Sequence, residues 1–171
     1  FRYSSVGALG YYENISADFV CLGKAMSTYG KVSALLGPAD IMDSLRDKVF
    51  ASYTYNDHPF GFYDALQTME TCDLIEDLYD HINGIGSLLM NGLNTIFSER
   101  GFDAKVYGHP SRTAIKTGVA QEVYWEFLSR LVDEKNILIH RPQFATMSHT
   151  IEDVEKTVAA ADEVLAEMGF K

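Results

Sequence analysis

The chain has 171 residues, 47% of them apolar and 22% charged, with a formal net charge of −10 at pH 7. This composition is typical of a globular protein and differs from that of a disordered one. The negative charge argues against nucleic acid or an anionic membrane as a partner, and no apolar run is long enough to span a membrane.

The two cysteines, Cys21 and Cys72, are far apart in the sequence. Their separation predicts free thiols in a reducing compartment such as the cytoplasm. The chain opens on Phe1 rather than on Met, which predicts a processed or cut protein, or a fragment of a longer one.

The first part of the chain predicts alternating strands and helices. The apolar run Phe19–Leu22 predicts a short buried strand, and residues 32–36 predict a second one that stops at Gly37. Pro38 then begins a helix over residues 39–49. This alternation predicts an α/β layer, which we interpret as the tail of a larger parallel sheet.

The middle of the chain predicts helices. One begins at Phe60, and a second run from Leu74 to Phe97 carries an apolar residue every three or four positions. This run contains three glycines, which lower helix propensity, so we expect close packing against a neighbouring element to compensate. The three are Gly84, Gly86 and Gly92.

The last part of the chain predicts a small α+β domain with antiparallel strands. We expect a hairpin from residues 104–107 and 113–117, a helix over 119–132, and short strands over 137–139 and 144–147. Thr150 predicts the cap of a final helix, with Asp153 placed to reach back to the cap. We place the domain boundary between residues 67 and 68.

Lys24 is the residue that most suggests chemistry. It follows the apolar run and Gly23 directly. A lysine at the end of a buried strand is costly to desolvate, which lowers the pKa of its amine and makes it a nucleophile able to form a Schiff base with a carbonyl. The pattern alone also fits a lysine whose amine reaches solvent, and Gly23 fits either a tight turn or a close approach of the backbone to a ligand.

Motifs dispersed along the chain support the reactive role. The motifs are Phe1-Arg2, Gly10-Tyr11-Tyr12, Ala17-Asp18, Leu22-Gly23-Lys24, Gly108-His109-Pro110-Ser111-Arg112 and Ser148-His149-Thr150-Ile151-Glu152-Asp153. With these motifs in this order, the chain resembles the C-terminal part of the class III pyridoxal-phosphate-dependent aminotransferases. These are fold-type I enzymes, and they include the glutamate-1-semialdehyde 2,1-aminomutases.

The resemblance implies a cofactor, pyridoxal 5′-phosphate, and a fold. Residues 1–67 would complete the large cofactor-binding domain, and residues 68–171 would form the small C-terminal domain. Lys24 would hold the cofactor aldehyde and later shuttle a proton. The active unit would be a homodimer, with the upstream half of the enzyme on the same chain or on another.

Three further residues are candidates for binding. The resemblance implies that Thr54 donates to the cofactor phosphate across the dimer interface, whereas a turn hydroxyl that caps the next helix is the plain alternative. Arg112 and Arg141 are weak candidates for the substrate carboxylate, because an arginine offers a matching fork of donors. Both also fit surface arginines.

The predicted function is transfer of an amino group between an amino donor and a keto or aldehyde acceptor. A glutamate-1-semialdehyde-type aminomutase is the alternative, and it is less favoured because no acidic residue lies between Arg141 and Ser148. Decarboxylation or racemisation on the same scaffold, and a degenerate or split subunit without activity, remain open. No spacing of residues suggests a metal site, and the acidic residues of 70–80 and 152–163 fit solvated helix faces.

Overall fold

The computed structural model describes residues 3, 15, 17–50, 59–139 and 141–171. The chain divides into two compact units, Phe1–Glu76 and Asp77–Lys171. The division therefore comes a little later than the boundary expected after residue 67, because α3 (Pro59–Leu74) contacts η1 (Lys24–Met26) and belongs with the first unit. No helix of the described residues is long and apolar enough to cross a membrane.

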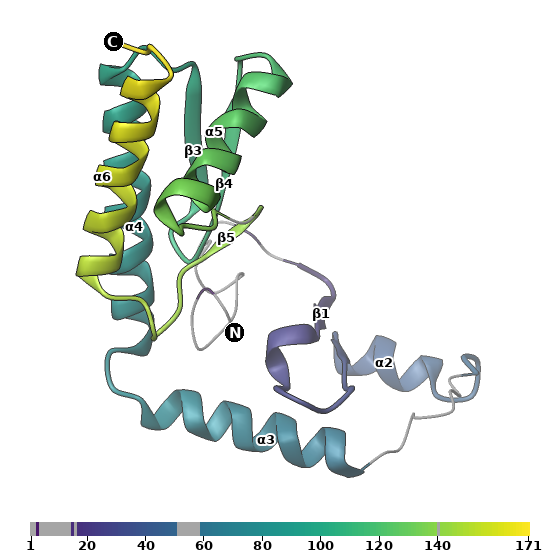
Figure 1. The fold of residues 1–171 in the computed structure, drawn as a ribbon. Helices are drawn as coiled ribbons and strands as arrows, with labels where there is room; N and C mark the ends of the chain where they lie inside the picture. Colours follow the sequence, from purple (N-terminus) through teal and green to yellow (C-terminus); the bar gives the residue numbers. More distant parts are fainter. Residues whose placement is uncertain (1–2, 4–14, 16, 51–58, 140) are drawn as a thin grey trace. The chain divides into compact units, whose positions relative to one another are not determined.

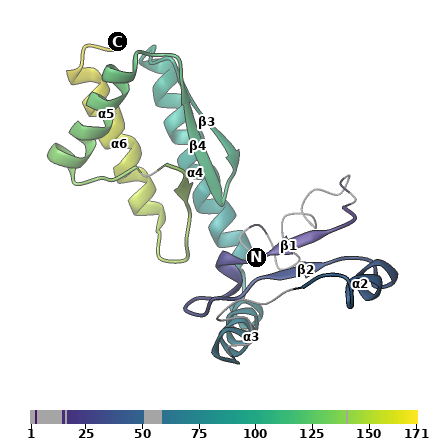
Figure 2. The ribbon, with the colours of Figure 1, turned by 90° about the vertical axis from the view of Figure 1, so that its right-hand side faces the viewer.

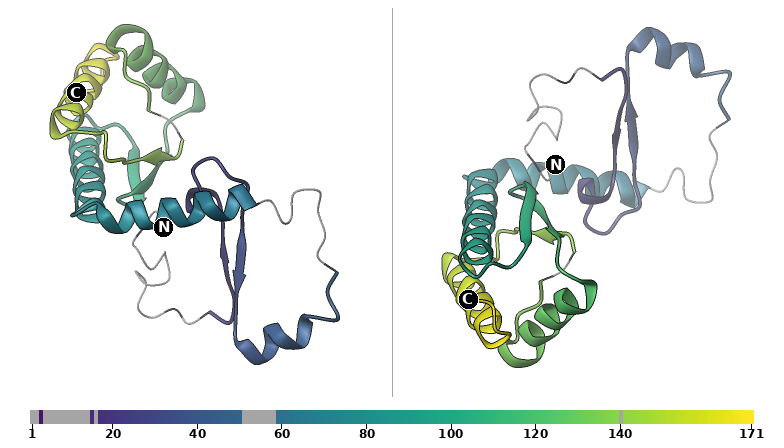
Figure 3. Two further views of the ribbon diagram at one scale, coloured as in Figure 1. Left: turned by 90° about the horizontal axis from the view of Figure 1, so that it is seen from below. Right: turned by 90° about the horizontal axis from the view of Figure 1, so that it is seen from above.

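The first unit is built on a two-stranded hairpin, β1 (Val20–Leu22) and β2 (Ala34–Leu36), which run side by side in Figure 3. The strands are antiparallel, with Cys21 opposite Leu35. These two strands therefore form a hairpin, and the larger parallel sheet expected around them stays a prediction. A parallel pair needs a crossover of about a dozen residues or more, and the connection through residues 23–33 is shorter than that and contains only a single helical turn.

Two helices complete the first unit, α2 (Ala39–Leu45) and α3. Helix α2 begins directly after Pro38, as expected, and ends before the predicted residue 49. Most large apolar side chains of this unit are exposed, so polar contacts between its loops and α3 give it much of its order.

The second unit packs three helices with one antiparallel sheet (Figure 1). Helices α4 and α6 lie side by side in Figures 1 and 2, and the strand order is β3-β4-β5. The elements are α4 (Leu78–Glu99), β3 (Ala104–His109), β4 (Arg112–Thr117), α5 (Gln121–Lys135), β5 (Gln143–Phe144) and α6 (Ile151–Glu167).

The core of the second unit centres on three buried phenylalanines. Phe97 of α4, Phe102 and Phe127 of α5 are each at most 2% exposed, and their ring centroids lie 5.3 to 5.9 Å apart. Helix α4 also closes the free edge of β3, because the side-chain amide of Asn94 exchanges two hydrogen bonds of 2.8 and 3.1 Å with the backbone of Val106. An unpaired strand edge is thereby satisfied.

Two of the three glycines of α4 allow close packing, as expected. A Cβ on Gly86 would lie 1.9 Å from the carbonyl oxygen of Pro110, and one on Gly92 would lie 2.6 Å from Val158. Gly84 is different, because a Cβ there would meet nothing within 4 Å. Close packing therefore explains the glycines at positions 86 and 92. The described residues give no structural reason for a glycine at position 84.

The strand expected over residues 137–139 is wrong. This segment has no strand pairing among the described residues. Ile137 and Ile139 instead pack on the core from an irregular segment, and Leu138 between them is 75% exposed. The alternation of buried and exposed residues that resembles a strand occurs here in a segment without a strand partner among the described residues.

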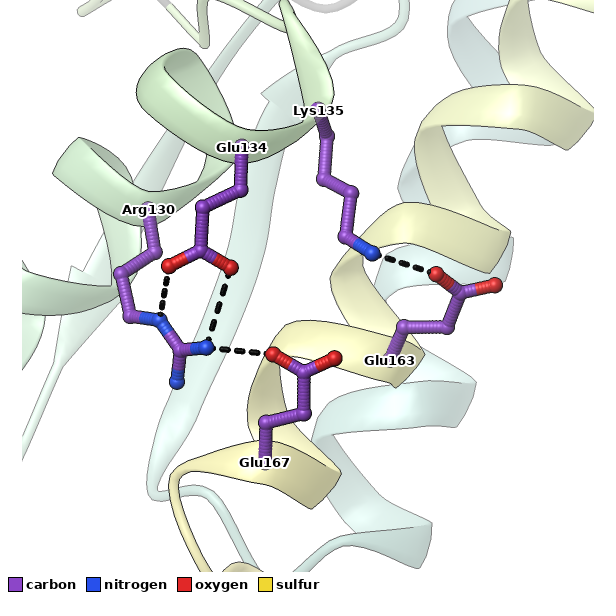
Figure 4. A network of polar contacts seen from close by, with 5 residues as sticks. All are labelled: Arg130, Glu134, Lys135, Glu163 and Glu167. Carbon is purple, nitrogen blue, oxygen red and sulfur yellow. Dashed lines mark hydrogen bonds and ion pairs between the residues drawn. The ribbon is translucent and has the colours of Figure 1, made fainter.

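Some acidic residues of α6 form ion pairs, so they are not all part of a simply solvated face. Asp162 pairs with Arg100 at 2.5 Å, and Glu163 pairs with Lys135 at 2.6 Å. Figure 4 shows how Arg130 of α5 joins Glu134 on its own helix and Glu167 on α6. These partly exposed pairs tie α6 to α4 and α5, and the surrounding solvent weakens each of them.

Candidate functional site

Lys24 opens the helical turn η1, two residues after β1 ends. Its φ of 53° is in the left-handed region, whereas Gly23 has an extended φ of 175°. A Cβ on Gly23 would make only an ordinary contact of 3.5 Å with Ser33. The unusual backbone conformation thus belongs to the lysine, although the sequence suggests the glycine, and a left-handed lysine is an uncommon conformation.

The side chain of Lys24 is exposed, and within the described part of the chain its amine has no hydrogen bond or ion pair. The strand before it was expected to be buried, and this expectation is wrong. Phe19 is 41% exposed, and Cys21 is exposed as well. The hairpin has two strands and the described residues leave much of its surface open. An amine that bonds covalently to an aldehyde must not be held in an ion pair.

The backbone after Lys24 is held by short-range hydrogen bonds. The amide of Met26 donates to the carbonyl of Gly23 at 3.3 Å, and the amide of Ser27 donates to the carbonyl of Lys24 at 3.1 Å. Met26 is 5% exposed and Ser27 is 9% exposed. The lysine is therefore the exposed end of a turn whose other end is anchored in the first unit.

Asp64 of α3 supplies that anchor. One oxygen of its carboxylate accepts hydrogen bonds from the hydroxyl of Ser27 and from the amides of Tyr29 and Gly30, the last two at 2.8 Å each. The hydrogen bond from Ser27, followed by those from Gly30 and Tyr29, lowers the pKa of Asp64 below its usual value. No motif in the sequence identifies Asp64 as an anchor. Gly61, a small residue one turn earlier on α3, is the signal that could have indicated close packing there.

The predicted phosphate ligand, Thr54, lies outside the described residues. Its proposed role therefore remains a prediction.

Arg141 makes contacts within the second unit. Its guanidinium donates to the carbonyl of Ile115 at 2.7 Å and lies 5.4 Å from the centre of the Tyr124 ring. Burial raises the pKa of the Tyr124 hydroxyl, and the charge of Arg141 opposes that rise. Part of the guanidinium fork is thus used for packing, while the arginine itself is still exposed.

Arg112 is the first residue of β4, and it pairs with His109 and Phe144 through the sheet. Its side chain is exposed, and it has no ion pair among the described residues. It offers an unused fork for a carboxylate, and its role in substrate binding stays a prediction.

The second unit also contains an apolar cavity of 280 Å³ between α4, the sheet and α6. It is lined mainly by aliphatic side chains and contains none of the predicted site residues. No cluster of three or more metal-ligating side chains occurs in the described ranges.

No protein-family model matches the chain. Individual relatives do match it along nearly its whole length. A glutamate-1-semialdehyde 2,1-aminomutase of Alkaliphilus oremlandii is 28% identical over 100% of this chain and 43% of its own length. A 3-aminobutyryl-CoA aminotransferase of Cloacimonas acidaminovorans is 27% identical over 98% of this chain and 42% of its own. The chain thus spans less than half the length of these relatives.

Solved structures of transaminases share the fold. The pyridoxal-phosphate internal aldimine form of the Sphingopyxis sp. MTA144 FumI protein matches 98% of this chain and 40% of its own, with a TM-score of 0.82 at 20% identity. An omega-transaminase from Sphaerobacter thermophilus matches 96% of this chain and 42% of its own, with a TM-score of 0.77 at 20% identity. The chain is therefore a homologue of glutamate-1-semialdehyde 2,1-aminomutases and aminotransferases, with the fold of part of a class III transaminase, as its motifs predicted.

Proposed function

We propose that the chain is part of a pyridoxal-phosphate-dependent enzyme that transfers an amino group from an amino donor to a keto or aldehyde acceptor. The observation that carries the proposal is the exposed amine of Lys24, which has no partner among the described residues, on a left-handed residue in a chain homologous to aminotransferases. The described residues fit the cofactor, because no ion pair among them competes for the amine that would hold it.

Lys24 would have two tasks in this proposal. Its Nζ would hold the cofactor, and it would accept and return the proton that moves during the transfer. Pyridoxal phosphate, when bound, supplies an aldehyde and a ring that takes up electrons. The turn from Gly23 to Ser27 would hold the backbone of Lys24 during both tasks. Arg112 stays a candidate for binding a substrate carboxylate.

Reduction with borohydride tests the proposal. The whole enzyme that contains this chain is mixed with an equimolar amount of pyridoxal phosphate, reduced, digested and mapped by mass spectrometry. We expect the label on the peptide that contains Lys24, and we expect its loss in Lys24→Ala. Lys31→Arg, which removes a second exposed lysine of the same unit, should be labelled like the wild type. A label on another lysine, or no label at all, contradicts the proposal.

An aminomutase is the second candidate, because several of the matched relatives are glutamate-1-semialdehyde 2,1-aminomutases. The two activities differ in their products. A transaminase passes nitrogen from one molecule to another, whereas an aminomutase moves it within one carbon skeleton. Transfer of ¹⁵N from a labelled amino donor to a separate keto acid supports the first candidate, and an isomerised product without such transfer supports the second.

We also propose that the active form is a homodimer in a reducing compartment. Helix α3 carries exposed apolar side chains, Phe60, Phe62, Tyr63 and Leu66, each 50–62% exposed. Such side chains favour coverage by another surface. The cysteines Cys21 and Cys72 are free thiols. Light scattering of the protein at micromolar concentration checks the dimer, and a mass that stays at one chain contradicts it.

A further inference from the structure

The carboxylate of Asp64 lies in the interior of α3, where an aspartate is a poor helix former. The residue is 9% exposed, and within the described part of the chain it has no ion pair. Donors from the segment 27–30 satisfy its charge instead. A buried carboxylate held by N–H and O–H donors fixes the backbone that carries them.

We propose that Asp64 is a positioning residue that sets the place of the Lys24 amine, an inference that rests on the function proposed above. The route is short and continuous. Asp64 holds the hydroxyl of Ser27, and the amide of Ser27 donates to the carbonyl of Lys24. No other residue of α3 reaches this turn through a charged group among the described contacts.

The backbone of Lys24 shows why an anchor is needed. An L-residue in the left-handed region is strained, because its Cβ comes close to the following carbonyl oxygen. Such a conformation persists when its surroundings leave no alternative, and it is often found at functional sites. With φ at 53°, Lys24 has this conformation between β1 on one side and the anchored Ser27 on the other.

Two glycines let α3 come close enough for the anchor to form. A Cβ on Gly30 would lie 2.6 Å from the Cα of Gly61, and a Cβ on Gly61 would lie 3.2 Å from the carbonyl oxygen of Lys31. One turn later on α3, the hydroxyls of Thr28 and Thr68 lie 3.1 Å apart. The loop is therefore held to the helix at two successive turns, and only the contact at Asp64 carries a charge.

The ionised form of Asp64 suits this role. Because its pKa is lowered by hydrogen bonds from Ser27, Gly30 and Tyr29, the carboxylate stays charged at neutral pH and acts only as an acceptor. An asparagine could still turn one uncharged oxygen toward the same three donors, but hydrogen bonds to an uncharged acceptor are weaker than those to a carboxylate. Asp64→Asn therefore keeps the size of the side chain and weakens the anchor.

The test compares Asp64→Asn with Asp73→Asn, which makes the same change of charge at an exposed position of the same helix. Two quantities are measured: hydrogen exchange of residues 24–30 in cofactor-free protein, and the rate of borohydride trapping at Lys24. For Asp64→Asn we expect exchange about tenfold faster, because the local structure opens more often. We expect trapping roughly 10- to 100-fold slower, because a misplaced reacting group loses about this much.

Ser27→Ala is a second variant, which removes one donor and keeps the carboxylate, and it should have an intermediate effect on both quantities. Asp73→Asn should behave like the wild type. Unchanged exchange and trapping in Asp64→Asn overturn the positioning role. If wild-type protein carries no label at Lys24, both the proposed function and the positioning role fail. If it carries the label and Asp64→Asn carries it equally fast, only the positioning role fails.

Discussion

The two units of the chain are ordered by different interactions. Residues 77–171 enclose an apolar core in which Phe97, Phe102 and Phe127 are almost fully buried. In residues 1–76, the described apolar side chains are mostly exposed, and a carboxylate at Asp64 organises the loop that carries Lys24. The comparison teaches that the predicted catalytic lysine depends on a polar anchor rather than on a core, so substitutions in the two units should have different effects.

The largest expected effect is a loss of stability in the second unit. Phe127→Ala removes a side chain with 0% exposure that contacts the rings of Phe97 and Phe102. We expect it to lower the free energy of unfolding by about 3–5 kcal/mol, measured by urea denaturation.

Phe62→Ala is the matched change in the first unit, where this side chain is 53% exposed. It should change the free energy of unfolding by no more than about 0.5 kcal/mol. Equal losses in the free energy of unfolding from the two substitutions would contradict the difference between the two units.

The next effect separates two glycines of one helix. Gly86→Ala should destabilise the second unit by roughly 1–3 kcal/mol, because the new Cβ would meet the backbone of Pro110 at 1.9 Å. Gly84→Ala should stabilise the same helix by about 0.5–1 kcal/mol, because its Cβ meets nothing and alanine favours helix. Thermal unfolding measures both, and shifts of the same sign would contradict this view of α4.

A smaller effect concerns the cap of α6. The hydroxyl of Thr150 accepts a hydrogen bond from the amide of Asp153 at 3.1 Å. Thr150→Ala should cost about 1 kcal/mol in the free energy of unfolding. Ser148→Ala, an exposed hydroxyl just before the cap, serves as the control and should leave stability unchanged.

The smallest effect is a dependence on pH. Backbone and side-chain hydrogen bonds from Thr150 lower the pKa of Asp153 below its usual value of 3.8. A lowered pKa means that the carboxylate stabilises the fold above pH 3.8, and this contribution is lost as the pH falls through the lowered pKa. Asp153→Ala should therefore be less stable than wild type at neutral pH, and the difference should shrink in acid. A difference that stays constant down to unfolding would contradict the capping role.

The sequence predicts the second unit better than the first. The apolar stripe from Leu78 to Phe97 and the capping pair Thr150 and Asp153 were confirmed, because both depend on neighbours close in the sequence. The start expected at Leu74 was wrong, because this residue ends α3. The strand expected over 137–139 was wrong, since a strand needs a partner that local alternation does not reveal. The buried strand before Lys24 was wrong in the described structure for a related reason, because an apolar run does not specify what covers it.

The anchor at Asp64 is a different case. An acidic residue within a helix fits a solvated face, and its partners at Ser27 and Tyr29 are more than thirty residues away in the sequence. Only the fold brings them together. Lys24 could thus be singled out from motifs, and its reactive role stays a prediction, whereas no motif pointed to the residue proposed to position it.

Visible absorption tests the central claim most directly. Wild-type protein mixed with pyridoxal phosphate should gain an absorption band from the lysine-bound cofactor, and the band should change when an amino donor is added. Lys24→Ala should lack the band, and Lys31→Arg should retain it. The same band in Lys24→Ala, or no band in the wild type, would contradict the assignment of Lys24 as the residue that holds the cofactor.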